Sequence, residues 1–161
     1  MITTRIQLLD ILENHDIETE ALQRQLDELS AELASDLDEI RNRVYPKATT
    51  YDRERVQAAP TPTDEKVTAM VMALDKREEQ YHNDVAVIQL RLAEMRLVYN
   101  KIHELESIHK STLLNLYYPV RTIEEVATMM KADRSTVRSR KNEAIEKLLK
   151  KLSKNAPAVH H

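Results

Sequence analysis

Four side chains within the stretch ADRSTVRSRKNEAIEKLLKKL are suited to hydrogen bonding with the edges of bases. Arg134 and Arg138 are four residues apart, so both point outward from one face of a helix. Ser135 and Ser139 repeat this spacing beside them. Arginine can donate a bidentate pair of hydrogen bonds to guanine, and serine can bond to a base or a phosphate. Other cations nearby are suited to neutralising phosphates, which gives affinity without sequence information: Lys131, Arg140 and Lys141.

The cations are concentrated in the C-terminal part of the chain. From Pro119 to the end, ten Lys and Arg stand against five Asp and Glu, a balance of +5. The rest of the chain has fourteen against twenty-two, a balance of −8, and the two parts add to the formal charge of −3. A basic module on an acidic body predicts that only the module meets a polyanion.

The sequence around these cations has the order of a helix–turn–helix. Thr122 and Glu125 form a capping box, which begins a helix with the apolar face Ile123, Val126, Ala127 and Met130. Lys131 and Ala132 make the turn, and Asp133 caps a second helix with the inner face Val137, Ala144, Ile145, Leu148 and Leu152. Such a second helix is buried through its apolar face, while its first turns stay polar to enter a major groove.

The composition predicts an all-α protein. The 161 residues include no Gly, Cys, Trp or Phe, and residues that favour helices dominate. Without Gly there is no phosphate-cradling loop. Without Cys there is no disulfide, thiolate zinc site or cysteine nucleophile. No apolar run approaches the roughly 18 residues of a membrane span, and no signal peptide is visible, so a soluble cytoplasmic protein is expected.

Two long helices should position the C-terminal module. The first runs to about Val44, with the segment LENHDIETE as a candidate interruption and Asp16 as a candidate N-cap. A proline-bounded loop over 45–64 follows, and a second long helix runs from about Glu65 to the region of Glu106 with Asp64 as its cap. Together they form a long antiparallel, coiled-coil-like hairpin. Glu78 interrupts the apolar stripe of the second helix. It is either a position at the rim of the stripe or a buried polar residue that fixes pairing register and oligomer state, and we favour the second.

This hairpin has a thin core, so further burial in a homodimer or higher oligomer is expected. The residues predicted to carry it lie on the two apolar stripes: Leu22, Leu26, Leu29, Leu33, Val85, Ile88, Leu92 and Met95. The predicted domains are the hairpin over 1–106, for oligomerisation or partner binding, the helix–turn–helix over 107–155, and a disordered tail over 156–161. His160 and His161 have the form of a purification-tag remnant.

Two Glu-x-x-His pairs have the spacing of ligands in di-iron helical bundles. They are Glu79 with His82 and Glu106 with His109, on or near the same predicted helix. The 27 residues between the pairs correspond to about 40 Å at the α-helical rise, so they cannot share one metal site within a chain. His103 has no partner for nucleophilic catalysis. We therefore expect no metal, no cofactor and no enzymatic activity.

The segment TIEEVATMMKADRSTVRSRKNEAIEKL resembles the fourth conserved region of bacterial sigma factors, and LLNLYY resembles the helix that precedes it there. The whole chain, with KATTYDRERVQAAP as its loop segment, is similar to phage late-gene transcription regulators of the RinA and ArpU type. The resemblance implies a regulator of phage or prophage genes in a bacterial host that binds double-stranded DNA, with host RNA polymerase as a candidate partner. It places base reading on the two arginines and two serines above, with Thr136 near the DNA backbone.

Two departures from the sigma pattern matter. Lys131 stands where that motif usually has Gly, and a left-handed conformation there would cost about 1 kcal/mol. Ser135 and Ser139 replace longer polar residues, so the target sequence need not be a −35 element.

Two alternatives stay open at this point. A small terminase subunit also joins a helix–turn–helix to coiled-coil helices, but it binds phage DNA for packaging. In a protein-interaction module, the acidic hairpin would bind a protein and the helix–turn–helix would contact no DNA. A ring of many subunits would favour the terminase, and binding to duplex DNA that weakens with salt would argue against the interaction module.

Overall fold

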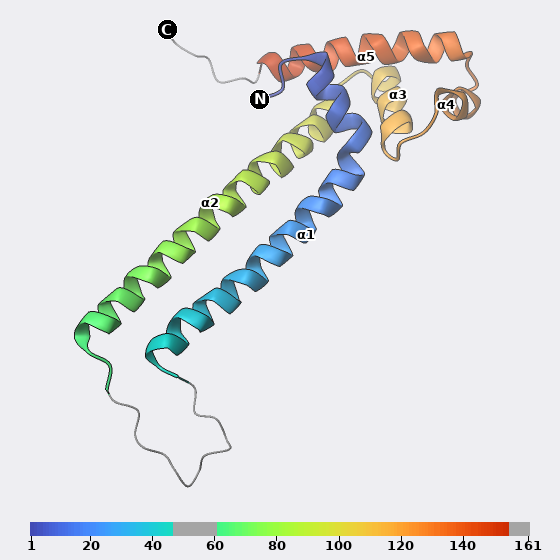
Figure 1. Ribbon diagram of the computed structural model, residues 1–161. Coiled ribbons are helices and arrows are strands. Elements are labelled where there is room, and N and C mark those ends of the chain that lie inside the picture. Colours follow the sequence, from blue (N-terminus) through green and yellow to red (C-terminus); the bar gives the residue numbers. More distant parts are fainter. Residues whose placement is uncertain (47–60, 155–161) are drawn as a thin grey trace. The chain divides into compact units, whose positions relative to one another are not determined.

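The chain is all-α, as its composition predicts. A computed structural model describes residues 1–46 and 61–154, and the helices there are α1 (Arg5–Val44), α2 (Asp64–Ile102), α3 (Ser107–Tyr117), α4 (Ile123–Met130) and α5 (Arg134–Lys154) (Figure 1). The loop segment over 47–57 and the tail over 156–161 lie outside the described residues. No helix in the described part of the chain has both the length and the apolar character needed to cross a bilayer.

The chain forms two compact units. The first contains Met1–Leu22 and the chain from Leu90 onward, and the second contains Gln23–Gln89. Helices α1 and α2 are therefore each divided between the two units. This division differs from the predicted boundary at residue 106, because the first turns of α1 and the last turns of α2 share their core with α3, α4 and α5.

Helix α1 is continuous, so the predicted interruption at LENHDIETE and the cap at Asp16 are wrong. Leu12 and His15 of that segment are buried. The imidazole Nε2 of His15 lies 2.5 Å from the carbonyl oxygen of Tyr117, and the ring stacks on Tyr118 at 4.1 Å between centroids. These contacts with a distant part of the chain hold the polar segment in the helix.

Helix α2 begins and ends differently from the prediction. The hydroxyl of Thr63 accepts the N–H of Lys66 at 3.3 Å, so Thr63, and not Asp64, caps the helix. The helix ends at Ile102 instead of near Glu106. Ile102 and Leu105 are both buried, and the N–H of Leu105 bonds to the carbonyl of Ile102 at 3.1 Å. The tight turn that buries both residues breaks the helix and begins α3 in a new direction.

In the second unit, parts of α1 and α2 pair with little complete burial. Arg77 Nε donates to the carboxylate of Asp36 at 2.7 Å across the pair. Ile88 is buried, whereas the other residues of this unit predicted for oligomerisation are half-buried: Leu26, Leu29, Leu33 and Val85. Glu78 is exposed, so the favoured prediction of a buried polar residue is wrong and the alternative, a position at the rim, agrees with the structure. A position at the rim of the stripe leaves its carboxylate in water, which avoids the cost of burying a charge.

The first unit holds the main core. Its fully covered side chains come from all five helices and include Leu8, Leu12, Val98, Ile102, Leu113, Val126, Val137, Ile145 and Leu148. Met95 belongs to this core, and Leu22 and Leu92 pack against it. These three residues were predicted for oligomerisation, but within one chain they already pack in or against the core. The core therefore fixes α4 and α5 on a rigid base.

Candidate nucleic-acid interface

Helix α4 begins with one half of the predicted capping box, and among the described residues the Glu125 carboxylate accepts no hydrogen bond from the N–H of Thr122. The hydroxyl of Thr122 accepts the N–H of Glu125 at 3.2 Å. Val126 and Ala127 are buried, while Ile123 and Met130 pack at the edge of the core. The apolar face predicted from the spacing is therefore the face that α4 buries.

The turn between α4 and α5 closes in the left-handed conformation expected at Lys131, where φ is 52° and ψ is 45°. The N–H of Ala132 bonds to the carbonyl of Ala127 at 3.0 Å, and the N–H of Lys131 reaches the carbonyl of Thr128 at 3.4 Å. This is the hydrogen-bond pattern of a helix C-cap that usually contains Gly, so Lys131 carries a strain of about 1 kcal/mol. The turn directs α5 away from the axis of α4.

Helix α5 buries the face that its sequence pattern predicts. All five inner residues are covered: Val137, Ala144, Ile145, Leu148 and Leu152. Asp133 immediately precedes the helix as predicted, and its main-chain carbonyl accepts the N–H of Val137 at 3.0 Å, but among the described residues its carboxylate accepts no N–H of the helix. Because α5 packs against both α3 and α4, the orientation of its outer face is fixed.

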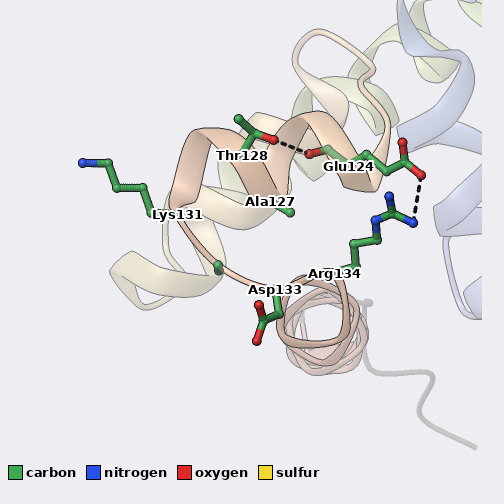
Figure 2. Close-up of a pocket in the computed structure, with 7 residues that line it drawn as sticks. Glu124, Ala127, Thr128, Lys131, Asp133 and Arg134 are labelled. Carbon is green, nitrogen blue, oxygen red and sulfur yellow. Dashed lines mark hydrogen bonds and ion pairs between the residues drawn. The ribbon is translucent and has the colours of Figure 1, made fainter.

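The four predicted base-reading residues are all exposed on α5: Arg134, Ser135, Arg138 and Ser139. Of the predicted phosphate contacts, Lys131 is exposed, whereas Thr136, Arg140 and Lys141 are half-buried. The ammonium of Lys141 lies 6.0 Å from the centre of the Tyr117 ring, a cation–π distance. Figure 2 shows Lys131 extending away from the turn.

An ion pair links the starts of the two helices. Arg134 Nη1 lies 3.1 Å from Glu124 Oε1, and both side chains are more than 60% exposed, at 62% and 64%. The pair flanks an open pocket of about 500 Å³ between α4 and α5 (Figure 2), which is also lined by Ala127, Thr128, Lys131, Ala132 and Asp133. Sequence reasoning assigned no role to Glu124. The sequence feature that could have indicated this ion pair is an acidic residue in the first turn of α4 together with an arginine at the start of α5.

The two Glu-x-x-His pairs lie in different parts of the fold. Glu79 and His82 lie on α2 in the second unit, whereas His109 lies on α3 in the first. His109 is buried, with Nε2 3.3 Å from a carboxylate oxygen of Glu143 and Nδ1 3.5 Å from the ammonium of Lys147. His109 therefore joins α3 to α5. Over residues 1–46 and 61–154 no cluster of three or more His, Asp or Glu side chains is arranged to hold a metal ion.

Comparison of the chain with protein-family models, with curated proteins and with solved structures finds no match. The assignment of a function therefore depends on the geometry of α4, α5 and their surroundings.

Proposed function

We propose that this protein is a sequence-specific transcription regulator that binds double-stranded DNA by inserting the first turns of α5 into the major groove. The regulated genes would be phage or prophage genes, late ones in particular, as the resemblance to RinA and ArpU regulators and to sigma region 4 suggests. In this proposal Arg134, Ser135, Arg138 and Ser139 contact base edges. Lys131, Thr136, Arg140 and Lys141 contact the phosphate backbone.

One observation carries the proposal: α5 begins with exposed polar side chains and continues with a buried apolar face, after a tight left-handed turn from α4. A recognition helix needs this arrangement, because its N-terminal residues must reach base edges while the rest of the helix is held rigidly. The local charge agrees with this function. Lys and Arg outnumber Asp and Glu two to one from Pro119 onward, although the chain as a whole is acidic.

We further propose that the regulator binds as a homodimer or higher oligomer, with the half-buried stripe of α1 and α2 in the second unit contributing to association. A dimer would place two copies of α5 in successive major grooves about 34 Å apart. Host RNA polymerase is the partner that an activating role would require.

Equilibrium binding to duplex DNA at two salt concentrations tests this function. We expect affinity to fall steeply with salt, because each neutralised phosphate contributes about −0.9 to the slope of log K against log salt. We also expect Arg138→Ala to reduce preference among fragments, whereas Lys150→Ala, an exposed cation far along α5, keeps that preference. Weak binding that is equal on all fragments and insensitive to salt would contradict the proposal.

A further inference from the structure

We propose that Arg5, at the start of α1, contacts the DNA backbone together with α5, so that the interface extends beyond the helix–turn–helix. This inference rests on the proposed function. The sequence of the helix–turn–helix contains no indication of it, since Arg5 is 126 residues before Lys131 and belongs to the acidic part of the chain.

The observation behind the proposal is a hydrogen bond between distant parts of the first unit. Arg5 Nη2 donates to the side-chain oxygen of Asn142 at 2.8 Å, across 137 residues of sequence. Arg5 is exposed, and it takes part in none of the ion pairs found among the described residues. Its positive charge is therefore oriented by a neutral amide and is available to an anion.

Asn142 lies on the face of α5 that carries the proposed base contacts. It follows Arg138 by four residues and Ser135 by seven, which are the spacings of one helix face. Asn142 is eight residues after Arg134, which corresponds to about 12 Å along the helix. When the first turns of α5 are on the bases, Asn142 and Arg5 lie farther along the helix, where contacts to phosphates are expected.

A second cation lies in the same neighbourhood. Lys141 precedes Asn142, and its ammonium is placed against the ring of Tyr117. Burial raises the pKa of Tyr117 to about 12, and the charge of Glu13 adds to this rise while the charge of Arg5 opposes it. Arg5, which donates to Asn142, and Lys141, the sequence neighbour of Asn142, therefore bring one cation from α1 and one from α5 to the same part of α5, which suits a phosphate better than a base edge.

The test is the salt dependence of binding to a mixed-sequence 30-base-pair duplex, measured on the full chain by fluorescence anisotropy. Each phosphate contact contributes a factor of about eight to affinity at 0.1 M salt. We expect Arg5→Gln to weaken binding about eightfold and to make the salt slope shallower by about 0.9. Arg5→Lys should keep the wild-type slope, because it keeps the charge. Arg96→Gln removes the same charge from an exposed position on α2 of the same unit and should change neither value.

The outcomes separate this inference from the proposed function. If wild-type protein binds DNA but Arg5→Gln has the wild-type affinity and slope, Arg5 makes no phosphate contact and only this inference fails. If Arg5→Gln weakens binding with an unchanged slope, its role is structural and the inference is also overturned. If the wild-type protein shows no salt-dependent binding, the proposed function fails. A circular-dichroism melt of each variant checks that a loss of binding does not reflect unfolding.

Discussion

Arg134 and Glu124 form a 3.1 Å ion pair that joins the first residue of α5 to the first turn of α4. Because both side chains are largely exposed, the pair contributes little to the free energy of folding, about 0–1 kcal/mol. The pair instead orients the guanidinium of Arg134 and changes the local charge at the start of α5. The carboxylate holds one nitrogen of the guanidinium, and it places a negative charge where the proposed interface meets DNA.

Glu124→Gln should therefore lower specificity rather than stability. Without the carboxylate, Arg134 is free to contact phosphates, and an added phosphate contact raises affinity for any duplex by about eightfold at 0.1 M salt. We expect the ratio of specific to non-specific affinity to fall, as measured by competition between fragments. Glu125→Gln is the matched control, because it removes the same charge from the next exposed residue of α4. An equal fall in this ratio for both variants would show that the pair has no special role.

The left-handed conformation of Lys131 predicts a stabilising substitution. Lys131→Gly should raise the free energy of unfolding by about 0.5–1 kcal/mol, because glycine adopts this conformation without the Cβ clash. The same substitution at the exposed Lys150 within α5 should lower it by about 1 kcal/mol, through reduced helix propensity. Urea denaturation of the two variants measures both values. Destabilisation by Lys131→Gly would argue against the turn as described.

The core under α5 predicts a large loss of stability from one truncation. Ile145 is completely buried, so Ile145→Ala should cost about 2–5 kcal/mol through lost transfer energy and a cavity. Ile17 on α1 is 75% exposed, and Ile17→Ala should change stability by less than about 0.5 kcal/mol. Denaturant midpoints compare the two. Similar costs at both positions would mean that Ile145 is not part of a packed core.

The buried Tyr117 and the half-buried Tyr118 predict a loss of stability at alkaline pH. Burial raises the pKa values of Tyr117 and Tyr118 from 10 to about 12. A raised pKa in the folded state gives stability that is fully present below pH 10. Between about pH 10 and 12 the unfolded chain loses these protons before the folded chain does, so stability falls as pH rises. Phenolate absorbance should show a late-titrating component that shrinks in Tyr117→Phe. Titration of all six tyrosines together near pH 10 would contradict this account.

The elements that the sequence predicts well are those with strong local patterns. The inner face of α5 follows from the spacing of its apolar residues, and the start of α4 follows from the cap at Thr122. The turn at Lys131 is located by the end of the apolar pattern of α4 before it and the start of the pattern of α5 after it. Each of these features depends on residues within one or two helical turns, so a linear sequence contains the information.

The features that the sequence did not predict depend on contacts between distant residues. The continuity of α1 at His15 involves the carbonyl of Tyr117, which is 102 residues away. The pairing of Arg5 with Asn142 likewise requires the start of α1 to share a unit with α5. The early end of α2 depends on the burial of Leu105 in a core formed by five helices. The spacing of apolar residues along a helix is the same whether or not a distant segment packs on it. This spacing therefore does not reveal the contacts made by His15, Arg5 and Leu105.

Selection from a random-sequence duplex library tests the central claim most directly. Wild-type protein and the variants Arg138→Ala and Lys150→Ala would each be used to enrich bound DNA, followed by sequencing. The account predicts one enriched motif for wild type, the same motif for Lys150→Ala, and loss of preference at one or more positions for Arg138→Ala. No enriched motif with wild-type protein, or an identical motif with Arg138→Ala, would contradict the assignment of α5 as a recognition helix read through Arg138.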